Sequence, residues 1–187
     1  TAMGSSSLYS LTNAANTVGI GFSAGYNNTT GLNNTYVGTN AGYSVTTATS
    51  NVCIGNDSGY SLTTGEENVS IGHNANYNRT TIGKSVAIGF EAGQNPTSYH
   101  TTAVGYQALK GASGTNTSSN NTAVGYQAGL AVTSTGMRNT FLGYASGSGV
   151  TSGNKNVFIG ALSADHCTTG VGNIVIGQDC ASGGTDY

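Results

Sequence analysis

The dominant pattern along the chain is a glycine that follows an apolar residue and returns about once every 17 positions. Ten segments align on this glycine, and their spacings are 17, 17, 17, 17, 16, 20, 18, 17 and 17. Self-similarity at a short fixed period is typical of solenoids, in which each repeat is one unit stacked on the next. The aligned glycines are Gly21, Gly38, Gly55, Gly72, Gly89, Gly105, Gly125, Gly143, Gly160 and Gly177.

Each repeat glycine is preceded by three residues that predict a short β-strand, the first at 18–20 and the last at 174–176. The residue directly before the glycine is always Ile, Val or Leu, and the residue two places earlier is always Val, Ile or Thr. β-Branched residues favour strands, and residues two apart lie on the same face of a strand. We therefore expect one strand per coil, with these two columns facing the core.

Small residues after the repeat glycine predict a narrow interior and a sharp corner. The third residue after it is Ala, Ser or Cys, as in Ala24 and Ser58. The fourth is mostly glycine, as in Gly25 and Gly42, with Asn76 in one segment. Gly and Asn adopt positive φ at low cost, which suits a corner. The predicted fold is all-β: a parallel β-solenoid (β-roll) of about ten 17-residue coils.

Two columns of aromatic residues are expected to stack along the solenoid. Tyr9 begins a series of five tyrosines that keeps the period of the repeat, and Phe90 begins a second series directly after the repeat glycine. Stacked rings stabilise neighbouring coils, but the same rings would also suit a strip that binds sugars, and we keep both interpretations. The candidate binding residues are Tyr26, Tyr43, Tyr60, Tyr77, Tyr106, Tyr126 and Tyr144.

The middle residue of each predicted strand is expected to face away from the core. Toward the C-terminus this column becomes bulky and apolar, at Phe141, Phe158 and Val175. Apolar residues on an outward face need cover. These three residues are therefore predicted to form an oligomer interface.

Composition and charge exclude several classes of partner. Charged residues make up 6% of the chain and the formal net charge is −2, whereas a nucleic-acid-binding protein shows a basic stripe. No apolar run approaches the ~20 residues that cross a membrane. Cys53, Cys167 and Cys180 show no metal-binding spacing, and the sequence leaves open whether Cys167 and Cys180 are bonded. We expect no nucleic acid, membrane insertion, metal or other cofactor.

The repeat resembles a known group of surface proteins. Residues 85–89 read SVAIG and residues 121–129 read NTAVGYQAG. The first resembles the head repeats of YadA-like trimeric autotransporter adhesins, and the second is similar to repeats of phage tail fibres. The resemblance implies a left-handed β-roll, a homotrimer and a role in attachment to a glycan or protein receptor of a host surface. It implies an extracellular location, on a bacterial cell or a virion fibre. The period here is longer than in the usual YadA head.

Three other functions compete with attachment. A glycan hydrolase needs two carboxylates, and Asp57 and Glu91 share a column two coils apart, but both also fit a solvated polar column. No catalytic residue is predicted, and the chain is not expected to be an enzyme. A monomeric ice-binding solenoid is the alternative function, because paired threonines such as Thr29 and Thr30 recur in several coils. Adjacent strand residues face opposite sides, so each pair would supply one outward rank. A repeated calcium site is not expected, because the turns lack a recurring Asp.

The repeat also sets the expected organisation of the chain. Residues 1–16 are either a cloning remnant or the beginning of a first coil, and residues 17–187 are the β-roll. A loop insertion is expected at 111–120, where the spacing between repeat glycines is longest. Inserted residues in a solenoid bulge outward and leave the stack intact.

Overall fold

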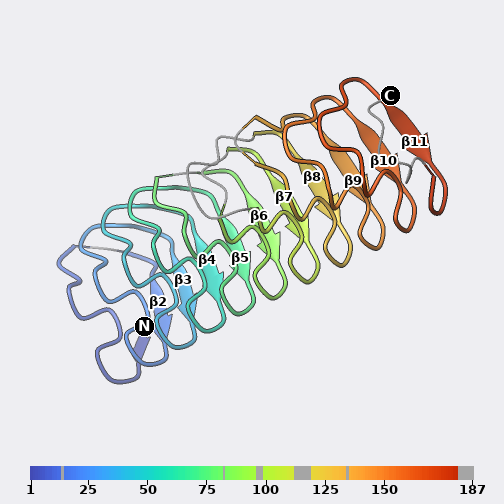
Figure 1. Cartoon of the computed structure of the whole chain (residues 1–187). Coiled ribbons are helices and arrows are strands. Elements are labelled where there is room, and N and C mark those ends of the chain that lie inside the picture. The colour runs from blue at the N-terminus through green and yellow to red at the C-terminus, as the bar shows by residue number, and fades with distance from the viewer. Residues whose placement is uncertain (14, 82, 96–98, 112–118, 134, 181–187) are drawn as a thin grey trace.

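Each repeat of the sequence forms one coil of a parallel β-solenoid, as the computed structural model shows (Figure 1). The structure describes residues 1–13, 15–81, 83–95, 99–111, 119–133 and 135–180. Within these residues, eleven strands form one sheet and no helix occurs. The strands follow one another along the rod in chain order, so β1 and β11 lie at opposite ends. The predicted all-β parallel solenoid is confirmed.

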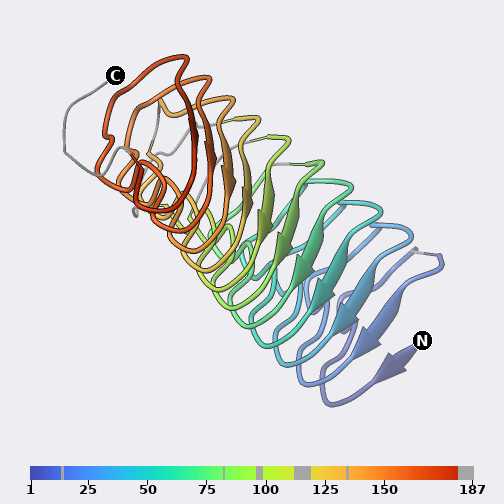
Figure 2. The same cartoon turned by 90° about the vertical axis from the view of Figure 1, so that its right-hand side faces the viewer.

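The strands are short, and they stack residue on residue along one side of the rod (Figure 2). From β2 on, each strand pairs with the next in register, as in Val69 opposite Val86. The coils of unequal length leave this register unchanged, since Val86 pairs with Thr102 and Thr102 with Thr122. The expected insertion at 111–120 falls mostly outside the described residues. The strands are β1 (Ala2–Met3), β2 (Val18–Ile20), β3 (Thr35–Val37), β4 (Val52–Ile54), β5 (Val69–Ile71), β6 (Val86–Ile88), β7 (Thr102–Val104), β8 (Thr122–Val124), β9 (Thr140–Leu142), β10 (Val157–Ile159) and β11 (Ile174–Ile176).

The first residues of the chain continue the stack. Strand β1 pairs in parallel with β2, with Met3 opposite Ile20. The Tyr9 ring stacks on Tyr26 at 5.2 Å, and the Ser10 N–H donates to the Tyr26 carbonyl at 3.0 Å. The described part of residues 1–16 is therefore a coil of the solenoid in this structure.

The strand faces are the reverse of those predicted from the sequence. The flanking positions face outward, with Ile20 and Leu142 37% and 45% exposed, whereas the middle positions of β2–β10 are buried. Phe141 and Phe158 are fully buried inside the chain's own coils, and Val175 packs against the same cluster. The expectation that these three residues face outward was wrong, and it no longer supports placing them in an oligomer interface.

The thin interior explains why the faces are reversed. A shift of one residue exchanges the two faces of a strand, so alternation alone allows either assignment. The interior accepts one mostly small column per strand, such as Ala87 and Ala103. Where a ring occurs, glycine makes room: a Cβ at Gly42 would overlap the Tyr36 ring. Gly42 also has φ of +61°, so the predicted corner at this column is confirmed.

A ladder of buried polar residues runs through the interior directly before each strand. The Asn51 N–H donates to Asn34 Oδ1 at 2.9 Å, and Asn51 Nδ2 donates to the Gly65 carbonyl at 2.9 Å. The same pattern recurs toward the C-terminus, and such ladders satisfy buried backbone groups and join successive coils. The column contains Thr17, Asn34, Asn51, Asn68, Ser85, Thr101, Asn121, Asn139, Asn156 and Asn173.

The apolar interior is divided into two clusters near the middle of the rod. One cluster extends to Leu62 and the other begins at Ala75. Arg79 continues the column of Leu62 but is 1% exposed, and its Nη2 donates to Thr101 Oγ1 at 2.6 Å. Burial lowers the pKa of Arg79 to about 9, because leaving water penalises the charged form. Asn76 Nδ2 donates to Ser70 Oγ at 2.7 Å in the same region. A polar layer therefore separates the two apolar cores.

Candidate binding surfaces

The outer face of the sheet is an apolar surface two columns wide. It is formed by the first and third residues of β2–β11, and none of these residues is charged. Several remain well exposed despite cover from neighbouring coils, including Ile88 at 37% and Val124 at 36%. The first column holds Val18, Thr35, Val52, Val69, Val86, Thr102, Thr122, Thr140, Val157 and Ile174, and the second holds Ile20, Val37, Ile54, Ile71, Ile88, Val104, Val124, Leu142, Ile159 and Ile176.

The area of this outer sheet face is comparable with that of the largest apolar patch on a typical monomer. Ten strands about 4.8 Å apart span roughly 48 Å, and two columns on one strand cover a width of about 10 Å, giving on the order of 500 Å². The largest apolar patch on a typical monomer is about 300–600 Å² and is often functional. Phe90 and Tyr106, which follow the second column in the sequence, are exposed as well.

The five N-terminal tyrosines form a continuous stacked ladder. Successive rings from Tyr9 to Tyr77 lie 5.2 Å apart, with interplanar angles of 6–12°. The face of each inner ring is therefore covered by its neighbours, and mainly ring edges and hydroxyls remain for a ligand. This geometry favours packing between coils as the role of Tyr26, Tyr43 and Tyr60. Binding by the four predicted residues Tyr26, Tyr43, Tyr60 and Tyr77 stays a prediction.

The second aromatic series also stacks. Phe90, Tyr106, Tyr126 and Tyr144 follow one another at 5.0–5.2 Å with interplanar angles of 6–8°. His73 extends this ladder with a tilted contact of 5.3 Å to Phe90. These rings lie at the surface, with Tyr126 42% and Tyr144 54% exposed. The faces of the inner rings are covered by their neighbours, as in the first ladder, and binding by Tyr106, Tyr126 and Tyr144 stays a prediction.

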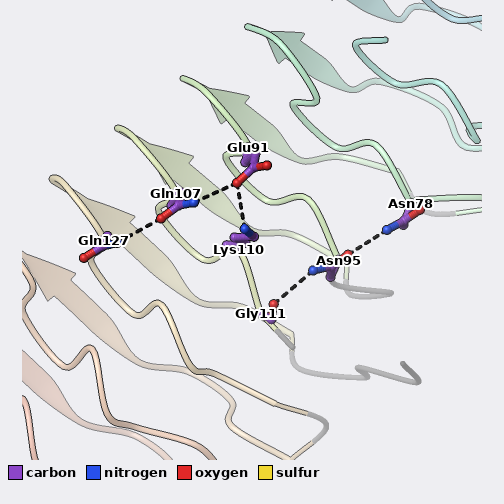
Figure 3. A network of polar contacts seen from close by, with 7 residues as sticks. All are labelled: Asn78, Glu91, Asn95, Gln107, Lys110, Gly111 and Gln127. Carbon is purple, nitrogen blue, oxygen red and sulfur yellow. Dashed lines mark hydrogen bonds and ion pairs between the residues drawn. The ribbon is translucent and has the colours of Figure 1, made fainter. Parts of the chain in front are cut away.

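Both carboxylates that could form a hydrolytic pair accept hydrogen bonds from side chains of neighbouring coils, and Figure 3 shows those of Glu91. Glu91 Oε2 accepts hydrogen bonds from Lys110 Nζ and Gln107 Nε2, both at 2.7 Å. Burial alone would raise the pKa of Glu91, but these two donors hold the pKa below its usual range. Asp57 Oδ1 accepts from Asn40 Nδ2 at 2.9 Å. A general acid in a glycosidase needs a raised pKa, so this arrangement suits bonding between coils.

The paired threonines divide their roles between the stack and the solvent. In three of the pairs the first threonine, at Thr29, Thr46 or Thr63, donates its hydroxyl to a carbonyl of the next coil at 2.9–3.3 Å. The second is exposed and leaves one outward rank per coil. This rank holds Thr30, Thr47, Thr64 and Thr81.

A groove of about 390 Å³ opens on the threonine side near the middle of the rod. Its walls come from three successive coils, and they combine an aromatic ring, hydroxyls and charges of both signs. Tyr99 is 50% exposed and lies outside both aromatic ladders. The lining residues are Thr64, Glu66, Thr81, Gly83, Lys84, Tyr99 and His100.

The cysteines are all free. Cys53 is fully buried, and burial raises the pKa of its thiol to about 12. Cys167 is also buried, whereas Cys180 is partly accessible. No group of three or more metal-binding side chains occurs among the residues that the structure describes. The described part of the chain also has no helix that is long and apolar enough to cross a membrane.

Sequence reasoning placed the aromatic ladders correctly but missed two features. The buried asparagine ladder has a readable signal, because Asn, Ser or Thr occupies the position before every strand. The groove at Tyr99 has a weaker signal: this tyrosine departs from both aromatic columns, in the coil where the spacing between repeat glycines is shortest.

No family model matches the chain, and comparisons with curated proteins and with solved structures give no match. The resemblance to adhesin heads and tail fibres therefore stays a prediction that rests on residues 85–89 and 121–129.

Proposed function

We propose that the chain is a segment of an extracellular attachment fibre, in which three copies pack their outer sheet faces around a common axis. The observation that carries this proposal is the uncharged apolar face over β2–β11. Burying such a face removes it from water, and each 100 Å² of apolar area contributes about 2.5 kcal/mol before the costs of association.

The regularity of the outer sheet face suits rotational symmetry along the rod. A rotation about an axis parallel to the rod places each coil at the same height as its counterparts, so equal residues meet in layers. Cyclic arrangements of this kind close on themselves and do not grow into aggregates. Because the columns contain no charge, no like charges oppose one another at the axis.

The polar edges of the solenoid would then face outward and carry the receptor contacts. The exposed threonine rank, the first tyrosine ladder and the groove at Tyr99 are the surfaces that remain accessible. Three copies of each surface on one rigid rod would bind a cell surface with avidity far above that of one site. The receptor class is a host-surface glycan or protein.

A monomeric ice-binding solenoid is the second candidate, and the exposed rank of Thr30, Thr47, Thr64 and Thr81 favours it. The outer sheet face is also flat and regular, but only its first column contains threonines, at Thr35, Thr102, Thr122 and Thr140. Thermal hysteresis of the purified chain, lost in a Thr47→Val and Thr64→Val double variant, would favour this function over attachment.

The attachment proposal is tested by placing a charge on the outer sheet face. Val124→Lys should reduce the mass of the particle to one chain and abolish adsorption of labelled protein to a panel of bacterial and animal cells. Thr47→Lys adds the same charge on an exposed edge and should preserve the mass. Wild-type protein that is monomeric, or that adsorbs to no cell in the panel, would contradict the proposal.

A further inference from the structure

We propose that the groove beside Tyr99 binds a short, uncharged saccharide. This inference rests on the proposed attachment function and assigns the chemistry of one receptor contact. The groove draws side chains from three successive coils, at Thr64, Lys84 and Tyr99 among others. Its volume of about 390 Å³ lies at the lower end of the ~300–1,000 Å³ typical of small-molecule sites.

Tyr99 supplies an aromatic surface that the ladder tyrosines do not. Inner ladder rings are covered by neighbours at 5.2 Å, whereas the nearest ring to Tyr99 is His100, at 6.2 Å and tilted by 43°. With half of its surface exposed, the Tyr99 ring can pack against the C–H face of a pyranose. An amphipathic tyrosine combines such packing with a hydroxyl able to hydrogen-bond a polar partner.

The polar groups around Tyr99 match an array of sugar hydroxyls. The Glu66 carboxylate accepts hydrogen bonds, the Lys84 ammonium donates them, and the threonine hydroxyls do both. The Lys84 ammonium lies 4.0 Å from the Glu67 carboxylate, and both side chains are more than half exposed. Such surface pairs are weak, so Lys84 can turn to a ligand at little cost.

The charge balance of the groove selects a neutral ligand. Glu66 and Lys84 carry opposite charges and line the same wall, one coil apart, with the Lys84 N–H donating to the Glu66 carbonyl at 2.9 Å. A sialic acid or sulfated sugar would be attracted by Lys84 and repelled by Glu66, so the pair gives an anion no net gain, whereas a neutral polyol can hydrogen-bond to both groups. The outer sheet face offers threonine hydroxyls but no charged group, so it matches an array of sugar hydroxyls less well.

The test screens the full chain on an array of neutral, sialylated and sulfated oligosaccharides, then measures the dissociation constant of the strongest neutral hit by NMR titration. Tyr99→Ala should weaken binding at least about tenfold, because one bound sugar face loses its contact, and Glu66→Gln should weaken it several-fold. Glu91→Gln, which makes the same carboxylate-to-amide change outside the groove, should stay within about twofold of the wild type. Unchanged circular dichroism of each variant verifies folding.

The inference is overturned if no neutral saccharide binds, if only anionic glycans bind, or if Tyr99→Ala binds as the wild type does. Its failure can be told apart from failure of the attachment function. A trimer that adsorbs to cells regardless of Tyr99 and Glu66 would remove the saccharide site and leave the fibre. A monomer that binds a neutral sugar through Tyr99 but adsorbs to no cell would remove the fibre and leave the site.

Discussion

Truncating two adjacent residues of β9 tests which face of the sheet is inside. Phe141 is fully buried, its ring lies 5.9 Å from that of Phe158, and a Cβ at Gly147 would overlap it. Because the surrounding coils cannot close around a missing ring, Phe141→Ala should cost about 3–5 kcal/mol. Leu142 is 45% exposed, so Leu142→Ala should cost at most about 1 kcal/mol within one chain.

Urea unfolding followed by circular dichroism, at several protein concentrations, separates the two effects. Phe141→Ala should lower the midpoint equally at every concentration, because its contacts lie within one chain. Leu142→Ala should lower it in a concentration-dependent way if the outer face joins chains. Solenoids can lose coils stepwise, so the variants are compared by whole curves. Equal losses for both variants at all concentrations, or no loss for Phe141→Ala, would refute the assignment of the faces.

Three further predictions follow from the interior and the polar ladder. Asn139→Ala removes two hydrogen bonds donated by its Nδ2, at 3.1 and 2.8 Å, and two accepted by its Oδ1, both at 3.0 Å. The substitution should lower the free energy of unfolding by about 2–4 kcal/mol and speed amide hydrogen exchange in the next coil. Exchange at the wild-type rate would contradict the role of the ladder. Gly42→Ala should be clearly more destabilising than Gly172→Ala, because both have positive φ but only at Gly42 would the new Cβ meet a buried ring, whereas nothing lies within 4 Å at Gly172; equal thermal shifts would contradict this. Burial would raise the pKa of Glu91, but the Lys110 ion pair holds this pKa below its ordinary value. The ion pair therefore stabilises the fold above the ordinary carboxyl pKa of about 4.3, and this stabilisation is lost as the pH falls through the lowered pKa. Glu91→Gln should flatten this acid limb of a profile of melting temperature against pH, and an unchanged limb would show that the pair contributes nothing.

The period and the column agreement predicted the architecture well. Glycine and alanine positions placed the corners, and the recurrence of Tyr9, Tyr26 and Tyr43 placed a ladder that the structure shows at 5.2 Å. These features depend on stacking identical columns, which a repeat sequence states directly. The register needed no further information, because a coil of nearly constant length brings each strand beside its counterpart.

The sequence pattern could not predict which face of each strand is buried, because hydrophobicity does not decide it in this fold. Aliphatic residues such as Ile88 and Leu142 face outward because a thin coil has room for only one column per strand. Interior volume, set by the corners, therefore overrode the usual preference for burying the most apolar residues. The groove at Tyr99 forms where side chains from three coils lie close together. The repeat period does not predict such contacts, because they depend on residues that differ from coil to coil.

The central claim is that the outer sheet face joins copies of this chain, and the mass of the particle in solution tests it most directly. Light scattering on a sizing column should give three times the 18.7 kDa of one chain, and the value should fall to one chain in Val124→Lys. A stable mass of one chain for the wild-type protein at micromolar concentration would contradict the claim, and would leave the apolar face to be explained by another partner.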